Sequence, residues 1–338
     1  MTILCPSGRG FPRSGAREKS GEKILIREGY SQQMLGFNEN VRLIITDVDD
    51  TVSRVYRKTD PKLIFELENL LSEGKSIVFT SGQSFRGIHE RITSLIAPDL
   101  RKRCLLVGCL GAEINRFDPK TGELVEKPVF SLYGKVSARK RGKWREIVKQ
   151  IVLEFDLKIF PIMPPEDFVR LTKGRKNSAM IADRGPQITF ELPNDTEGLL
   201  KARMKKRAEL LLKKAGIPAR PTLGGVSALD LRLDGASKEL AVRKILSERK
   251  FLKMIGLEKR EMVPSEERIE IWGDRFEKGL PDSEISLAVP RGVRSIDFRD
   301  EDRKKFPKGR KIVFWDGKKR LSLGLLEYLK NRKKRRAV

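Results

Sequence analysis

The sequence predicts an α/β fold in which a doubly wound, Rossmann-like parallel sheet is interrupted by an inserted α+β domain. Short apolar or β-branched runs alternate with helical stretches toward both ends of the chain, which is the pattern of a parallel sheet covered on both faces. Between residues 128 and 233 the strand-like runs are fewer and shorter. The length of 338 residues also exceeds that of most single domains.

The first part of the core is predicted from strand-like runs and the helix between them. Residues 41–46 are mostly apolar or β-branched and the run stops at Asp47, as expected of a buried parallel strand. Asp60 and Pro61 offer an N-cap and a first-turn proline, and leucines at helical spacing follow as far as Gly74. The next elements are expected to be a strand at 76–80, a helix, and a strand at 104–107.

The remaining elements follow from the same periodicities. In the inserted domain we expect helices at 138–155 and 196–215 and short strands at 178–182 and 187–192. After it we expect a helix at 237–247, strands at 268–272, 285–289 and 311–315, and a last helix from Leu321. The predicted parts are a flexible N-terminal extension at 1–40, core at 41–127, the inserted cap domain at 128–233, and core with a basic C-terminal tail at 234–338.

Charge and hydrophobic content restrict the class of protein. Lys and Arg number 71 against 46 Asp and Glu, a net charge of +25, while 39% hydrophobic residues suffice for folded cores. No run of about 18 apolar residues is present, so no membrane span is expected. The basic runs, densest at 303–311 and 332–336, are interpreted as a solvated surface that binds nucleic acid only non-specifically at low salt.

Cysteine and histidine usage restrict the chemistry. Cys5, Cys104 and Cys109 form neither a disulfide framework nor a zinc pattern, and residues 1–20 lack the apolar centre of a secretory signal, so we expect a cytoplasmic protein. His89 is the only histidine, which excludes most Ser-His-Asp, Cys-His and His-ligated metal mechanisms. The acids and bases of an enzyme would therefore be carboxylates.

Polar residues follow the predicted core strands, at the place where ligands of open α/β sheets bind. They come from four separate segments and are expected to meet at one edge of the sheet. They are Asp47, Asp49, Asp50 and Thr51 after the first strand, Ser81 and Gly82 after the second, Ser237 and Lys238 at the start of the late helix, and Gly273, Asp274 and Asp282 after the next strand.

The acids of this set predict a divalent cation. Two carboxylates about 4 Å apart repel by roughly 4 kcal/mol at an effective dielectric of about 20, so Asp47, Asp49 and Asp274 are not expected to stay ionised together without one. An all-oxygen set favours Mg²⁺. A lysine, a hydroxyl group and amides at helix starts are suited to hold phosphate oxygens. Together these residues predict phosphoryl transfer through an aspartyl-phosphate.

The four segments resemble, in order and strand context, the motifs of the haloacid dehalogenase superfamily of phosphatases and phosphomutases. The motifs are DVDDT at 47–51, FTSG at 79–82, Ser237-Lys238, and Gly273-Asp274 with Asp282. The segment 111–122 resembles a hairpin of the type-IIB branch, whose cap lies between motifs two and three. The spacing within 273–285 is similar to that of phosphomannomutases and sugar-phosphate phosphatases. The sequence departs from the family pattern at Leu110, where Asn is usual, and at Asp50, where Gly is commonest.

The resemblance implies a role for each residue at a matching position. Asp47 would attack phosphorus and become phosphorylated, and Asp49 would protonate the leaving alcohol and then activate water. Thr51 would orient Asp49. The residues implied to hold phosphate oxygens are Ser81, the amide of Gly82, and Lys238, and those implied to bind Mg²⁺ are Asp47, Asp274 and the backbone carbonyl of Asp49, with Asp282 behind them or as a further ligand.

The sequence therefore predicts a Mg²⁺-dependent phosphatase acting on a small phosphate ester, with a sugar phosphate as the first candidate. Two alternatives stay open. One is a phosphomutase of the phosphomannomutase kind, which isomerises its substrate without net release of phosphate. The other is a basic nucleic-acid-binding protein that uses the fold as a scaffold. The cap residues Arg170, Arg175, Lys176 and Asn177 are candidates to reach the substrate, although a solvated basic loop explains them equally well.

Overall fold

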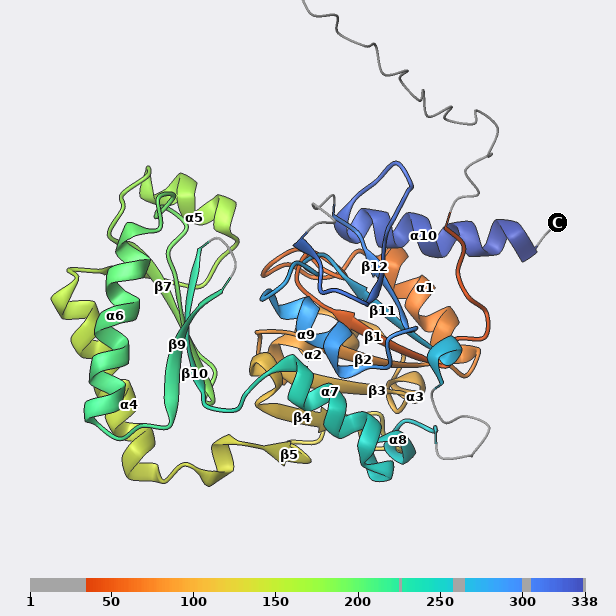
Figure 1. Ribbon diagram of the computed structural model, residues 1–338, viewed down its shortest axis with the longest axis horizontal. Helices are drawn as coiled ribbons and strands as arrows, with labels where there is room; N and C mark the ends of the chain where they lie inside the picture. Colours follow the sequence, from red (N-terminus) through yellow and green to blue (C-terminus); the bar gives the residue numbers. More distant parts are fainter. Residues whose placement is uncertain (1–34, 225–226, 258–264, 300–304, 337–338) are drawn as a thin grey trace, which may run out of the picture. The chain divides into compact units, whose positions relative to one another are not determined.

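Two β-sheets organise the protein in the computed structural model, which describes residues 35–224, 227–257, 265–299 and 305–336 (Figure 1). Most of the predicted extension at 1–40 lies outside the described residues. Of its last residues, Leu35 and Phe37 pack against the apolar core of the larger sheet. The Leu35 amide also donates a hydrogen bond to Asp316 at 3.1 Å.

The larger sheet has the strand order β13-β12-β11-β1-β2-β3-β4-β5. Neighbours from β13 to β3 pair in parallel, and β4 and β5 add antiparallel strands at one edge. The strands are β1 (Leu43–Asp47), β2 (Ser76–Thr80), β3 (Cys104–Gly108), β4 (Glu113–Arg116), β5 (Phe130–Ser131), β11 (Ile269–Gly273), β12 (Arg294–Asp297) and β13 (Lys311–Phe314). The predicted α/β class with a doubly wound, mainly parallel sheet is confirmed.

Helices cover both faces of this sheet because buried side chains alternate between the faces along each strand. In β1, for example, Ile44 joins the apolar cluster of one face, and Leu43 and Ile45 join that of the other. The helices of the first face are α1 (Pro61–Ser72), α2 (Phe85–Arg91), α3 (Pro98–Arg101) and α10 (Leu321–Arg336), and those of the second are α7 (Lys238–Ser247), α8 (Arg249–Met254) and α9 (Pro281–Ala288). Asp60 caps α1 as predicted, accepting from the Lys62 amide at 2.8 Å.

The smaller sheet has the order β6-β7-β8-β10-β9 and comes from the middle of the chain. Trp144 of α4 and Met204 of α6 join Phe190 and Leu231 in one apolar cluster, so these two helices cover one face of the sheet. Its elements are α4 (Ala138–Glu154), β6 (Lys158–Phe160), α5 (Pro165–Thr172), β7 (Ser178–Asp183), β8 (Gln187–Glu191), α6 (Leu199–Lys214), β9 (Ala219–Gly224) and β10 (Ala228–Leu233). We call residues 138–233 the cap segment; the predicted domain boundaries themselves stay a prediction.

The strand predicted at 285–289 is wrong, because most of this run lies in helix α9. Pro281 stands in the first turn of α9, and Ile285 and Ala288, three residues apart, are buried on the same side. Periodicity does not separate a short apolar run in a strand from one in a buried helix. The strand at this place in the sheet is β12, whose pattern is interrupted by Ser295. The elements that the sequence did not predict individually are α3, β4, β5, β6, α5, β9, β10, α8 and β12.

Arg332 of α10 differs from the expected solvated basic tail. Its side chain is buried, its Nε lies 2.8 Å from a Glu39 carboxylate oxygen, and its guanidinium also contacts Glu73. These ion pairs join α10 to the segment before β1 and to the end of α1. Within the described part of the chain, no helix is both long enough and apolar enough to cross a membrane.

A buried carboxylate, Glu270 of β11, joins three elements of the larger sheet's core. It accepts hydrogen bonds from Trp272 Nε1 at 2.7 Å and from the Tyr328 hydroxyl at 2.8 Å. It also pairs with Arg294 of β12 at 2.9 Å. A charge this deeply buried is tolerated when it is paired and hydrogen-bonded. The network therefore fixes α10, through Tyr328, against β11 and β12.

Arg294→Met tests this network. The substitution leaves the Glu270 carboxylate buried without its cation, so we expect it to lower the free energy of unfolding by about 3–5 kcal/mol. Urea denaturation of wild type and variant measures the difference. The control is Lys62→Met at an exposed position of α1, where we expect a change below about 0.5 kcal/mol. Equal stability of the two variants would contradict the role given to the ion pair.

Candidate active site

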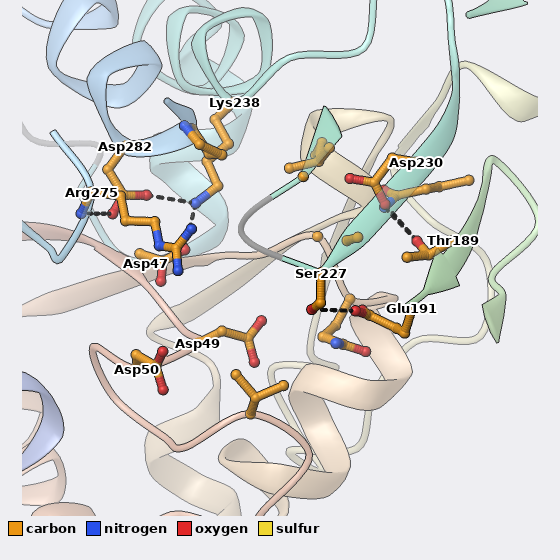
Figure 2. A pocket seen from close by; sticks show the side chains of 18 of the residues that line it. Asp47, Asp49, Asp50, Thr189, Glu191, Ser227, Asp230, Lys238, Arg275 and Asp282 are labelled. Carbon is orange, nitrogen blue, oxygen red and sulfur yellow. Dashed lines mark hydrogen bonds and ion pairs between the residues drawn. The ribbon is translucent and has the colours of Figure 1, made fainter. Parts of the chain in front are cut away.

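Four charged side chains meet at the carboxyl ends of the central strands, and Figure 2 labels three of them, Asp47, Lys238 and Asp282. Asp47 is the last residue of β1, and Asp274 follows β11. Lys238 opens α7, and Asp282 lies in the first turn of α9. Because β1 and β11 pair in parallel, their carboxyl ends lie side by side. The structure thus brings together the first, third and fourth segments that the sequence singled out.

Lys238 is buried between two of these carboxylates. Its Nζ contacts Asp47 Oδ1 and lies 2.9 Å from Asp282 Oδ1. Burial alone would lower the pKa of Lys238, but the negative charges of Asp282 and Asp47 outweigh it and raise the pKa above its usual value. The lysine is therefore a fixed positive charge at the end of β1.

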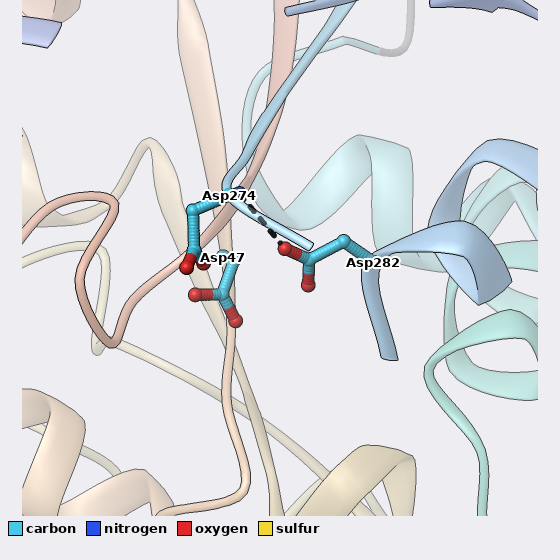
Figure 3. Close-up of side chains that lie close together, drawn as sticks. All are labelled: Asp47, Asp274 and Asp282. Atoms are coloured by element: carbon cyan, nitrogen blue, oxygen red, sulfur yellow. Dashed lines mark hydrogen bonds between the residues drawn. The ribbon is translucent and has the colours of Figure 1, made fainter. Parts of the chain in front are cut away.

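Asp47, Asp274 and Asp282 form a buried carboxylate cluster (Figure 3). One oxygen of each lies within 4.8 Å of the others. Burial raises the pKa of Asp47 well above its usual value; the charge of Asp282 adds to this effect and that of Lys238 opposes it. Burial also raises the pKa of Asp274 to about 7, again with a contribution from Asp282. A buried all-oxygen cluster of this kind fits a hard divalent cation.

Backbone amides and an arginine hold the cluster in place. Asp282 Oδ2 accepts from the amides of Asp274 and Arg275, each at 3.0 Å. Arg299, just beyond β12, contacts Asp274 and lies 3.4 Å from Asp50. Asp50 has a left-handed backbone with φ 65°, a conformation that favours Gly and that Asp tolerates. The left-handed conformation fits the Gly that is commonest at this position of the family pattern. In this chain the position holds Asp50, whose carboxylate is paired with Arg299.

Asp49 is oriented by two side chains that the sequence analysis did not assign to it. Ser81 Oγ donates to one carboxylate oxygen at 2.8 Å, and Arg91 Nη1 donates to the other at 2.7 Å. Thr51, expected to orient Asp49, instead donates to Asp274 Oδ1 at 3.3 Å. Ser81 is fully buried, whereas Gly82 lines the cavity described next.

A cavity of about 310 Å³ lies over these acids and is walled by both the larger sheet and the cap segment. Strand β8 supplies much of the cap wall, because its polar side chains alternate with Ile188 and Phe190, which pack in the cap's apolar cluster. The polar residues of this wall are Arg184, Gln187, Thr189, Glu191, Ser227 and Asp230. The sequence predicted a strand at 187–192, but not that the polar side chains of this strand would line a cavity.

The cap wall is cross-linked by hydrogen bonds, of which Figure 2 shows those of Thr189 with Asp230 and of Ser227 with Glu191, and it reaches the core through Tyr56. Asp230 Oδ1 accepts from Gln187 at 2.8 Å and from Thr189 at 2.6 Å. Glu191 accepts from the Tyr56 hydroxyl at 3.1 Å and from Ser227 at 3.2 Å. Burial raises the pKa of Glu191, and the charge of Asp230 adds to it.

Arg184 completes the connection between cap wall and core, donating to the Tyr56 hydroxyl and to Gln83, each at 3.1 Å. The cap residues suggested from the sequence lie elsewhere. Among the described residues that line the cavity, none is Arg170, Arg175, Lys176 or Asn177. Arg170 instead pairs with Asp167 at 2.8 Å.

A left-handed turn after β3 packs against two of the motif segments. Cys109, Leu110 and Gly111 have φ of 52°, 52° and 90°. The amides of Cys109 and Leu110 donate to the carbonyls of Gln83 at 2.8 Å and Ser81 at 3.0 Å. Gly111 lies against the backbone carbonyl of Ser237, where a Cβ would overlap it. The strained turn therefore fixes the second and third segments relative to each other.

Gly111→Ala tests this close approach. The added methyl group overlaps the Ser237 carbonyl and the residue must keep a positive φ, so we expect a loss of more than about 2 kcal/mol in the free energy of unfolding. Thermal and urea unfolding measure it. Gly134→Ala is the matched control, since a Cβ there meets no atom within 4 Å. If the Gly111→Ala protein were as stable as the control, the turn at 109–111 could accommodate a Cβ and would not be fixed by the Ser237 carbonyl.

Solved structures share this arrangement of elements at low sequence identity. The C-terminal domain of a trehalose-6-phosphate phosphatase from C. albicans is 14% identical with a TM-score of 0.55, covering 87% of this chain and 93% of that one. A haloacid dehalogenase-like hydrolase from Bacteroides thetaiotaomicron is 14% identical with a TM-score of 0.51, covering 86% and 99%. No family model and no curated protein matches the sequence. The fold expected from the four motifs is confirmed.

Proposed function

We propose that this chain, which has the fold of the haloacid dehalogenase-like hydrolases, is a phosphoric monoester hydrolase. One observation carries the proposal. Asp47 and Asp49 line a cavity for a small ester at the carboxyl edge of the sheet, where Lys238 and the buried carboxylate cluster also lie. Ligands of such sheets bind at this edge. Assignment to the type-IIB branch remains part of the proposal.

In the first half-reaction Asp47 is the proposed nucleophile. One of its carboxylate oxygens forms a bond to phosphorus while the bond from phosphorus to the ester oxygen breaks. The leaving oxygen takes the proton of the Asp49 carboxylic acid, which yields the free alcohol and an Asp49 carboxylate. Lys238, in contact with Asp47, is proposed to hold a phosphate oxygen beside the nucleophile.

In the second half-reaction a water molecule attacks the phosphorus of the aspartyl-phosphate. Asp49 takes one proton of this water, and the bond between phosphorus and the Asp47 oxygen breaks, which releases inorganic phosphate and restores the Asp47 carboxylate. Ser81 holds Asp49 through its hydroxyl. Gly82, which lines the cavity, is proposed to offer its amide to the phosphate, and Ser81 to contribute on the same side.

Mg²⁺ is the proposed cofactor, held by Asp47, Asp274 and the backbone carbonyl of Asp49, with Asp282 beside them. When bound, it would stabilise the negative charge of the phosphoryl group and of the carboxylates around it. The convergence of three buried carboxylates within 4.8 Å supports the assignment. Lys238 and Arg299 offset part of this negative charge through their contacts with the same residues.

A sugar phosphate is the proposed substrate class. The cap wall offers hydrogen-bonding groups from Arg184, Thr189, Glu191 and Asp230. Among the described residues that line the cavity none is aromatic, so no aromatic ring there would stack on a nucleobase. The C. albicans structure is named as a phosphatase of a sugar phosphate. A phosphomutase would return the phosphoryl group to the sugar, and a nucleic-acid-binding scaffold would not need Asp47; both alternatives are separated from the proposal by the assay below.

Phosphate release over a panel of sugar phosphates, nucleotides and an aryl phosphate, with Mg²⁺ or with EDTA, tests the activity. We expect release that requires Mg²⁺ and falls by more than about 10³-fold in Asp47→Asn, because the amide is no nucleophile. Release that survives Asp47→Asn would exclude the proposed nucleophile. Isomerisation of a hexose phosphate without release would instead identify a mutase.

Mg²⁺ should stabilise the protein more at high pH than at low pH. Without metal, folding raises the Asp274 pKa from 3.8 to about 7, so the stability tied to its proton is present below pH 3.8 and is lost as the pH rises through about 7. A cation replaces this proton. Thermal unfolding with Mg²⁺ or EDTA should show a larger Tm difference at pH 8 than at pH 5.5. In Asp274→Asn, which cannot ionise, the pH dependence of this difference should shrink; equal differences in wild type at both pH values would contradict the assignment.

A further inference from the structure

Arg91, at the end of α2, is a buried arginine whose three guanidinium nitrogens all donate hydrogen bonds around Asp49 and residues 54–57. It is 8% exposed. Its Nη1 donates to Asp49 Oδ1 at 2.7 Å, its Nη2 to the carbonyl of Arg54 at 2.7 Å, and its Nε to the carbonyl of Arg57 at 3.0 Å. Arg91 does not line the cavity, whereas Asp49 does. The arginine therefore lies behind Asp49, outside the reach of a substrate in the cavity.

The two carboxylate oxygens of Asp49 are both bound from the same segment of chain. Arg91 holds Oδ1, and Ser81, ten residues earlier, holds Oδ2 at 2.8 Å. A carboxylate gripped at both oxygens has a fixed orientation, and an acid–base group must lie within hydrogen-bond reach of the atom whose proton it moves. Neighbouring side chains with fixed rotamers hold an acid–base group in the position that its proton transfer requires.

The carbonyls that Arg91 binds belong to the part of the chain that contacts the cap segment. Arg57 Nη2 lies 2.9 Å from Glu166 and 3.2 Å from Asp167, both on α5. Tyr56 donates to Glu191 of the cap wall at 3.1 Å. One guanidinium thus joins Asp49 to residues 54–57, whose side chains hold the cap.

We propose that Arg91 is a positioning residue for Asp49, and that it makes the placement of this carboxylate depend on the contact between residues 54–57 and the cap. The inference rests on the proposed phosphatase activity. Arg91 touches neither substrate nor phosphorus; it acts through Asp49 alone. Removing Arg91 should therefore misplace Asp49. Because the attacking water must lose a proton to Asp49, the aspartyl-phosphate should then break down slowly.

A double-mutant cycle between Arg91→Met and Asp49→Asn measures whether Arg91 acts through Asp49. We expect Arg91→Met to lower kcat for an alkyl phosphate roughly 10- to 100-fold when Asp49 is present. In the Asp49→Asn background the same substitution should change the rate by less than about 3-fold, since there is no carboxylate left to position. With an aryl phosphate, whose leaving group needs no acid, Arg91→Met should accumulate phosphoenzyme, detected by intact mass after an acid quench.

Arg101→Met is the matched control. Arg101 is also buried, at 9% exposure, and also binds backbone carbonyls, those of Ile96 at 2.8 Å and Ser94 at 3.0 Å. No hydrogen bond or ion pair in the described structure links it to Asp49. Its loss therefore reports what removing a buried arginine does to the fold, and we expect no accumulation of phosphoenzyme.

Each outcome decides between the two proposals. An equal loss from Arg91→Met in both backgrounds, or accumulation of phosphoenzyme in Arg101→Met as well, overturns the positioning role and leaves the phosphatase intact. Wild type that releases no phosphate from any ester overturns both. If thermal unfolding shows that Arg91→Met does not fold, Arg91→Lys takes its place. Lysine keeps the charge near Asp49, but its single nitrogen does not reproduce the planar guanidinium that uses three nitrogens for three separate acceptors. It should show the same dependence on Asp49 with a smaller loss.

Discussion

The ion pairs of Lys238 with Asp47 and Asp282 are the interaction on which the rest of the site depends. The three residues come from α7, β1 and α9, so one ammonium group joins three elements at the carboxyl edge of the sheet. Two carboxylates about 4 Å apart repel by roughly 4 kcal/mol at an effective dielectric of about 20. A parallel sheet can gather acids at its edge only where a cation or a bound proton offsets this repulsion, and here the ammonium group of buried Lys238 supplies part of that charge.

The same edge also gathers local conformations that are unfavourable on their own. Asp50, Cys109 and Leu110 all have positive φ, and the turn at 109–111 is fixed from both sides by the second and third motif segments. Strain of this kind persists only where the surrounding structure over-determines it, and it concentrates at functional sites. The stability needed to hold it comes from elsewhere in the sheet, where Glu270 with Arg294 and Tyr328 joins β11, β12 and α10.

The sequence predicted the sheet and the core of the site because both leave local patterns. Buried parallel strands appear as apolar runs, and the acids that follow them stand at fixed places after those runs. The strand expected at 285–289 was wrong because a short apolar run has no decisive period. Arg91 and Arg184 left no pattern at all, since each reaches its partner only through tertiary folding: Asp49 is 42 residues from Arg91, and Tyr56 is 128 residues from Arg184. The role of Thr51 toward Asp49 was implied by the resemblance to the family motifs, whereas in the structure its hydroxyl donates to Asp274.

The cap wall and the loop that carries Asp49 are connected by hydrogen bonds. In the proposed function the cap wall supplies the groups that face the leaving group. Glu191 and Arg184 of that wall also hold Tyr56, which belongs to the loop that carries Asp49. Binding energy from remote parts of a substrate raises the rate of a reaction only if it is used to place the reacting groups. The structure offers a route for this. A substrate that contacts the cap wall would contact residues that are hydrogen-bonded to residues 54–57, and Arg91 joins residues 54–57 to Asp49, the proposed acid–base group. Esters that fill only the phosphate end of the cavity lack this route, so selectivity among substrates should appear in kcat as much as in KM.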